Sequence, residues 1–272
     1  MRNGLNLITL TSDFEKQSQS IAVMHAMIYT IAPQAKIIDL MHGLPSYNLI
    51  SAARTMETVS HMPVGVHICV CDPGVGSKRK AIICEVERGD YFIGPDNGVF
   101  VPATKILGGI TRVYEITNSA YLNKTISPLF HGRDVFAPVA AHLINNVPIK
   151  DFGPELIQFN IEKTPYEEAS INDKHIKATI IQINKFGSAH LNILHSQWDK
   201  LKFSIGSNII IKHPNGSELI VKYAKTFSDL PIGHSMILND DYGRIEIAIN
   251  QGNFSKQYNL KIGDVLNIVF EN

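Results

Sequence analysis

The sequence predicts an α/β N-terminal domain with a largely parallel central sheet, followed by a small antiparallel β-barrel C-terminal domain. In the first half, short β-rich runs alternate with segments whose apolar residues repeat at helical spacing, which is typical of helices layered on a parallel sheet. In the second half, short β-rich runs alternate with turn residues, and helical periods end within two turns. The predicted boundaries are 1–154 for the α/β domain, 155–174 for a linker and 175–272 for the barrel.

The strands of the α/β domain are predicted from apolar and β-branched runs. Several runs are continuously apolar, as expected for strands covered on both faces. The predicted strands are 5–11, 36–40, 66–71, 81–86, 91–93 and 113–116.

Three helices are predicted between these strands. Apolar residues from Ile21 to Ile31 recur at helical spacing and predict a helix over 20–32. The others are expected over 49–60 and 134–145, where Pro138 falls near the first turn, a position at which helices tolerate proline.

The second half begins with a polar stretch, residues 157–174, which favours a linker or a surface excursion. The barrel strands are then predicted at 177–183, 208–212, 218–223, 244–249 and 265–270.

Composition limits the classes of partner. Lys and Arg (25) balance Asp and Glu (25), so no global field favours nucleic acid or an acidic membrane surface. Apolar runs stay shorter than the roughly 18 residues of a spanning helix, and the first residues do not resemble a secretory signal. The three cysteines lie in apolar surroundings, where reduced core thiols are expected, so the predicted location is cytoplasmic.

Polar residues gather where the predicted strands end. Asp13, Asp72 and Asp96 each come just after a strand, and His131 comes just before the third helix. Because ligands of open α/β sheets bind at the carboxyl ends of the strands, these side chains are candidates for one site.

Each fragment alone also has a structural interpretation. Asp72 begins an Asp-Pro-Gly sequence and Asp96 precedes Asn-Gly, and both patterns are common in turns. Gly74 and Gly76 form only a GxG, without the rest of a dinucleotide fingerprint, so no Rossmann cofactor site is predicted.

Taken in order, five motifs resemble the S-adenosylmethionine hydroxide adenosyltransferases, the adenosine-forming S-adenosylmethionine hydrolases related to the fluorinase and chlorinase. The resemblance extends from about residue 5 to residue 268. The motifs are Thr-Leu-Thr-Ser-Asp-Phe at 9–14, Asp-Pro-Gly-Val-Gly at 72–76, Gly-Pro-Asp-Asn-Gly at 94–98, Phe-His-Gly-Arg-Asp-Val-Phe-Ala-Pro at 130–138 and Ile-Glu-Ile-Ala-Ile-Asn at 245–250.

The resemblance implies a reaction, an assembly and a catalytic set. The family hydrolyses S-adenosyl-L-methionine to adenosine and L-methionine, without a metal or redox cofactor, in a homotrimer whose sites lie between subunits. Its Asp, Arg and His match Asp72, Arg79 and His131. The halogenating relatives lack this set, so water or hydroxide is the implied nucleophile.

These residue types suit attack at C5′ of a sulfonium. The leaving group is a neutral thioether, so no general acid is needed. The site must instead hold water in line, about 3 to 3.5 Å from the carbon, and accept its proton. An arginine lowers the pKa of a nearby water, while Asp or His accepts the proton.

The resemblance also implies substrate-holding residues. Asp13 matches the carboxylate that accepts hydrogen bonds from both ribose hydroxyls. Tyr47 is a candidate for covering the sugar or the adenine, and a surface-anchoring role is the alternative. The remaining matches are Phe186, Asn192, Glu246 and Asn250 in the barrel, where Phe186 and Asn250 also suit core and turn positions.

Two motifs depart from the family pattern. After Asp13-Phe14, the chain has Glu15 where the family has Gly, and Ser18 and Ser20 where it has Asp and Tyr. The barrel motif Asp-Arg-Phe-Gly-Asn is here Asn184-Lys-Phe-Gly-Ser188, so Asn184 and Ser188 are candidates only. The family's Asp at position 184 would pair with the ammonium of the methionine moiety, whereas Asn184 can only form a hydrogen bond with it. Losing this partly buried charge pair costs roughly 1 to 3 kcal/mol, which predicts weaker substrate affinity.

Three alternatives to the hydrolase remain open from sequence. A weakened family member could bind an adenosyl ligand as a sensor or docking protein. A metal-dependent hydrolase could use Asp13, Asp72, Asp96 and His131 as ligands, although their spacing matches no metal motif. A halogenase would form a 5′-halo-adenosine, and His131 argues against it.

Overall fold

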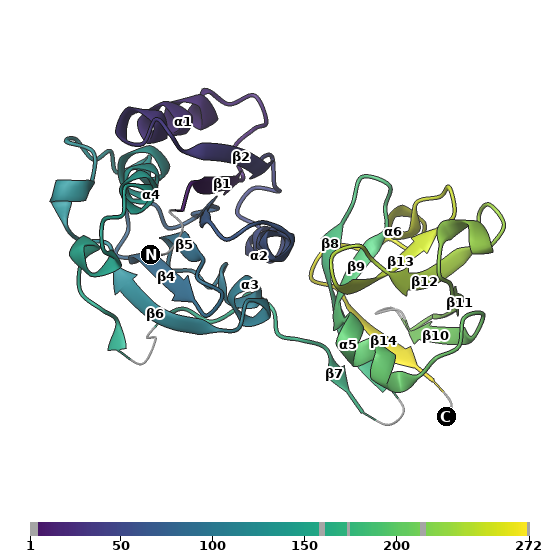
Figure 1. Ribbon diagram of the computed structural model, residues 1–272. Coiled ribbons are helices and arrows are strands. Elements are labelled where there is room, and N and C mark those ends of the chain that lie inside the picture. Colours follow the sequence, from purple (N-terminus) through teal and green to yellow (C-terminus); the bar gives the residue numbers. More distant parts are fainter. Residues whose placement is uncertain (1–4, 158–160, 173–174, 213–215, 271–272) are drawn as a thin grey trace. The chain divides into compact units, whose positions relative to one another are not determined.

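The computed structural model describes residues 5–157, 161–172, 175–212 and 216–270. The chain divides into two compact units, Met1–Pro165 and Tyr166–Asn272 (Figure 1). The segment predicted as a linker, 155–174, is therefore shared between the two units. Within the described ranges, no helix has both the length and the apolar character that a membrane crossing requires.

The first unit is built on a six-stranded sheet in the order β2-β1-β3-β5-β4-β6. Neighbours among β2, β1, β3 and β5 are parallel, and β4 is antiparallel to both β5 and β6, so the largely parallel sheet is confirmed. The strands are β1 (Leu7–Ser12), β2 (Lys36–Met41), β3 (Val66–Val70), β4 (Ala81–Val86), β5 (Tyr91–Pro95) and β6 (Ile110–Glu115).

Helices cover this sheet in two pairs. Figure 1 shows α1 (Gln19–Ile31) beside α4 (Ala137–Ile144), and α2 (Leu49–Glu57) beside α3 (Val101–Ile106). Alternate side chains of β1 and β3 pack with α1 and α4 in the main core, because successive strand residues point to opposite faces. The predicted helix over 49–60 is α2 followed by the 3-10 turn Thr58–His61. The sequence did not predict α3, whose six residues are too few for a clear period.

The third predicted helix begins with a π-helical turn, Gly132–Phe136, and continues as α4. Pro138 gives the physical reason, because it has no N–H to donate to the carbonyl of Asp134 and its ring crowds that carbonyl. The Asn123 N–H donates to this carbonyl instead, at 2.9 Å. The widened turn directly follows His131, and π-turns are frequent at functional sites.

The second unit is a closed barrel of seven strands. The order is β14-β10-β11-β12-β13-β9-β8, and a β14–β8 pairing closes it, with β7 on the edge of β8. The predicted barrel is confirmed, with one pair that is parallel rather than antiparallel, β11 with β12. The chain between these two strands crosses back over the barrel through the 3-10 turn Phe227–Asp229.

The barrel strands have these bounds. They are β7 (Ser170–Ile171), β8 (His175–Ile183), β9 (Ala189–Leu194), β10 (Asn208–Lys212), β11 (Glu218–Tyr223), β12 (Ser235–Asn239), β13 (Arg244–Ile249) and β14 (Val265–Val269), with short helices α5 (His195–Trp198) and α6 (Phe254–Gln257). Of the main strands, β9 and β12 were not among those predicted.

A buried polar chain crosses the face of the sheet opposite the main core. His67 lies 2.9 Å from the Thr9 hydroxyl through Nδ1 and 3.0 Å from Asp90 through Nε2. Arg88 donates to both oxygens of Asp90, at 2.7 and 2.9 Å. Burial by itself raises the pKa of Asp90, but the hydrogen bonds from His67 and Arg88 reverse this and lower that pKa to about 2.

We expect Asp90→Asn to lower the free energy of unfolding by about 2 kcal/mol at pH 7, because it leaves the partly buried Arg88 guanidinium without its charged partner. The lowered pKa of Asp90 means that its stabilisation is present above about pH 4 and is lost as the pH falls toward 2. The difference between wild type and variant should therefore shrink at pH 3 in urea denaturation. The exposed Glu87→Gln change in the same unit is the control, and an Asp90→Asn effect no larger than this control contradicts the prediction.

Candidate functional site

A cavity of about 260 Å³ lies at the carboxyl ends of β1 and β3. Asp13 follows β1 and Asp72 follows β3, which are neighbours in the parallel sheet, so the strand geometry brings both carboxylates to one edge. The cavity wall also includes Tyr47, Phe130 and His131. The structure thus gathers four of the predicted site residues in one place.

Arg79, the fifth, is held against Asp72. Its Nε donates to both Asp72 oxygens at 3.1 Å, and Nη2 lies 2.5 Å from Oδ2. The pair is well buried, with 11% of the Arg79 side chain and 5% of the Asp72 side chain exposed. A planar guanidinium holds a carboxylate in a fixed orientation, so the pair is a rigid platform at the cavity edge.

The second Nη2 hydrogen of Arg79 connects this platform to His131. Nη2 lies 2.7 Å from His131 Nδ1. Because a guanidinium can only donate, Nδ1 must accept, and this contact assigns the imidazole proton to Nε2. Burial lowers the pKa of His131, and the Arg79 charge lowers it further. His131 is therefore a neutral imidazole with an N–H as its second polar group.

Asp13 is oriented by the loop that follows β2. The Tyr47 N–H donates to Asp13 Oδ2 at 3.0 Å, and the Cys71 thiol contacts the same oxygen at 3.8 Å. Tyr47 has φ of 61°, a left-handed conformation that is uncommon for an aromatic residue. Such backbone strain concentrates at ligand sites, and here it turns the Tyr47 amide toward the carboxylate.

Sequence reasoning missed the residues that hold the end of β1. His42 Nδ1 lies 2.7 Å from the Ser12 hydroxyl, and its Nε2 lies 3.2 Å from Asp39. Ser12 directly precedes Asp13, so this contact helps to fix where the carboxylate emerges from the strand. The only sequence signal was a histidine beside Gly43 at the end of a predicted strand.

A second cavity, of about 650 Å³, lies in the barrel. Five of the six predicted barrel residues line it: Asn184, Phe186, Ser188, Glu246 and Asn250. Asn192 is not among its described lining residues. Its side chain accepts the Thr179 N–H and donates to the Glu167 carbonyl, both at 2.7 Å, which ties the chain before β7 to the barrel.

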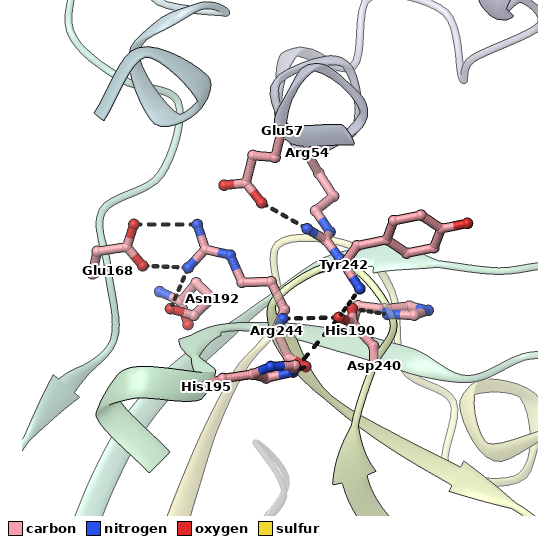
Figure 2. A network of polar contacts seen from close by, with 9 residues as sticks. All are labelled: Arg54, Glu57, Glu168, His190, Asn192, His195, Asp240, Tyr242 and Arg244. Carbon is pink, nitrogen blue, oxygen red and sulfur yellow. Dashed lines mark hydrogen bonds and ion pairs between the residues drawn. The ribbon is translucent and has the colours of Figure 1, made fainter. Parts of the chain in front are cut away.

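Arg244 strengthens the same connection. Figure 2 shows its fully buried guanidinium paired with both carboxylate oxygens of Glu168, beside Asn192. The Arg244 guanidinium also lies over the Tyr166 ring, 5.8 Å from its centre. These contacts explain why residues after Pro165 belong to the barrel unit.

Two of the barrel candidates have hydrogen bonds that shape the cavity wall. Asn184 Oδ1 accepts the N–H groups of Phe186 and Ser188, at 3.0 and 3.1 Å, and so builds the β8–β9 turn. The Asn250 side chain donates to the Leu230 carbonyl at 2.8 Å. Phe186 remains 67% exposed, which leaves its ring available to a ligand.

The metal-site alternative finds little support in the geometry. Asp96 is not among the described residues that line the first cavity, and it accepts the Glu162 N–H at 2.8 Å. Among the residues the structure describes, no three His, Cys, Asp or Glu side chains form a group that could hold a metal ion.

Comparison with known proteins identifies the family of the chain. Residues 8–153 match the family model of the SAM hydroxide adenosyltransferase N-terminal domain. Residues 178–267 match the family model of the corresponding C-terminal domain. The chain belongs to the SAM hydroxide adenosyltransferase family. Every predicted site residue falls inside one of the two matched regions.

Several relatives align along nearly the whole chain. An (R)-S-adenosyl-L-methionine hydrolase from Salinispora arenicola is 31% identical over 262 residues, with 96% of this chain and 97% of that protein covered. A fluorinase from Nocardia brasiliensis is 21% identical, with 94% of each chain covered. The crystal structure of an uncharacterized conserved protein from Thermotoga maritima has a TM-score of 0.91 and 30% identity, and it covers 97% of this chain and 100% of its own.

We expect Arg79→Met to raise the pKa of His131, because the variant removes the positive charge that lies 2.7 Å from Nδ1. NMR titration of the imidazole signals measures this shift. His142 is a matched control, since burial alone lowers its pKa and its signal should not move. An unchanged His131 titration contradicts the assigned contact.

Proposed function

We propose that this chain hydrolyses S-adenosyl-L-methionine to adenosine and L-methionine by attack of water on C5′. The observation that carries the proposal is the partly buried Asp72–Arg79–His131 arrangement, in which Asp72 and His131 line the first cavity beside Asp13. Family membership and the hydrolase relatives support the same reaction.

In this mechanism, Asp72 and His131 both orient the water. Arg79 leaves lone pairs on the Asp72 carboxylate, so Asp72 can accept a hydrogen bond from water, while His131 Nε2–H can donate one to the water oxygen. Because His131 Nε2 already carries a proton, Asp72 is the better acceptor for the proton that water loses. The new O–C5′ bond forms as the C5′–S bond breaks, and methionine leaves as a neutral thioether.

The substrate is proposed to bind through residues of both units. Among the described contacts of Asp13, both fall on Oδ2, which leaves Oδ1 for the ribose hydroxyls. Tyr47, Asn184, Phe186, Ser188, Glu246 and Asn250 complete the proposed substrate-binding set. Asn192 supports the barrel that carries them.

We further propose that the protein is a homotrimer in the cytoplasm, with each substrate site formed between neighbouring subunits. The substrate candidates are split between two cavities, one in each unit, which supports a composite site. Cys69, Cys71 and Cys84 are free and buried, which supports a reducing compartment. Light scattering should give about three times the monomer mass, and a monomeric mass contradicts the trimer.

Incubation with S-adenosylmethionine should yield equimolar adenosine and methionine. We expect Asp72→Asn to lower kcat by roughly 10²- to 10⁴-fold, because the amide cannot accept the proton from water. Chromatography of the products measures both results, and the exposed Glu87→Gln variant is the control.

The same assay separates the alternatives. Added chloride or fluoride should give no 5′-halo-adenosine, whereas a halide-dependent product identifies a halogenase. Activity should survive thorough chelation, and its loss identifies a metal-dependent hydrolase. Tight adenosine binding in calorimetry without turnover identifies a sensor or docking protein.

A further inference from the structure

His190 forms a hydrogen-bonded chain in the barrel that the proposed reaction leaves unused. It lies on β9, lines the second cavity and is buried, with 8% of its side chain exposed. Its Nδ1 lies 2.9 Å from Asp240 Oδ2. Figure 2 shows the two side chains facing each other. A buried histidine with a carboxylate behind it has a fixed ring orientation.

Asp240 is itself fixed by the backbone. Its other oxygen, Oδ1, accepts the N–H groups of Tyr242 and Arg244, both at 2.8 Å, in the turn between β12 and β13. His195 Nε2 lies farther away, 3.9 Å from Oδ1. Asp240 therefore holds the His190 ring in a fixed position relative to the β12–β13 turn.

The opposite side of the ring faces two proposed substrate-binding side chains. His190 Nε2 lies 3.4 Å from Glu246 Oε2 and 3.4 Å from Asn184 Nδ2. A neutral His190 that donates to Asp240 can accept from Asn184, whereas a protonated His190 donates to Glu246. In both forms, Asp240 fixes the direction of the nitrogen that these side chains meet.

We propose that the Asp240–His190 pair is a positioning device for Glu246 and Asn184, and thereby sets how tightly the barrel cavity holds the substrate. The inference rests on the proposed function. Glu246 is buried, and burial raises its pKa, although the His190 charge and a hydrogen bond with the Ser188 side chain lower it. Since His190 Nε2 lies 3.4 Å from Glu246 Oε2, the ring position that Asp240 sets limits where this carboxylate can lie. The pair acts on binding, because the proposed water-activating residues lie in the other unit.

The test compares His190→Leu, His190→Gln and Asp240→Asn. We expect His190→Leu to raise KM for S-adenosylmethionine about 10-fold while kcat stays within about 3-fold, as expected for a lost binding contact. His190→Gln places an amide near the position of Nε2, so it should recover most of the loss in KM. Asp240→Asn can keep the turn but no longer accepts from Nδ1, so KM should rise with His190 intact.

Matched controls separate positioning from general damage. His175→Leu replaces an exposed histidine on β8 and should leave KM unchanged. Thermal melting of each variant reports folding, and if His190→Leu does not fold, the Gln and Asp240→Asn variants decide the result. Unchanged KM in folded variants overturns the inference, as does a loss confined to kcat.

Calorimetric binding of S-adenosylmethionine keeps the two proposals distinct. Wild-type binding without turnover overturns the proposed hydrolysis, and the inference is then decided by the ratio of Kd values between wild type and variants. Turnover with equal Kd values across the series overturns only the role of His190. If the wild type does not bind at all, both are overturned.

Discussion

The Arg79 guanidinium organises the first cavity because it donates to two different side chains there. Nε and one Nη2 hydrogen orient Asp72, and the other Nη2 hydrogen reaches His131. This contact fixes the His131 tautomer, and the Arg79 charge helps to keep the imidazole neutral. In the proposed mechanism, Asp72 therefore accepts a proton and His131 donates a hydrogen bond. Arg79 itself is occupied by its partners and acts by holding them.

This arrangement depends on the parallel sheet below it. Because β1 and β3 run side by side, the residues that follow them emerge at one edge. The Ser12–His42 contact and the strained Tyr47 backbone then refine the position of Asp13. In the barrel, Asp240 and His190 hold side chains of the second cavity in a comparable way. Each cavity thus combines candidate ligand-binding groups with buried neighbours that orient them.

Much of the fold was predictable from local patterns. Strands buried on both faces have nearly continuous apolar sequences, so the strand over 81–86 was predicted with the bounds that β4 has, although β4 is antiparallel to both of its neighbours. Two short elements were harder to predict. Helix α3 contains only six residues, and in β9 the polar residues His190 and Asn192 interrupt the apolar run. The parallel pairing of β11 with β12 depends on a crossover, which strand composition does not encode.

The sequence by itself determined the α/β and barrel organisation and the identities of the candidate residues, because apolar periodicity and ordered motifs are local properties. Only the tertiary structure decided which of these residues meet. It joined Asp72, Arg79 and His131, separated Asn192 from the barrel cavity, and revealed His42, His190 and Asp240 as orienting partners. Hydrogen bonds between such distant positions depend on strand register and loop conformation. The motifs identify the side chains, and the contacts formed on folding set where each side chain is protonated and how it is oriented.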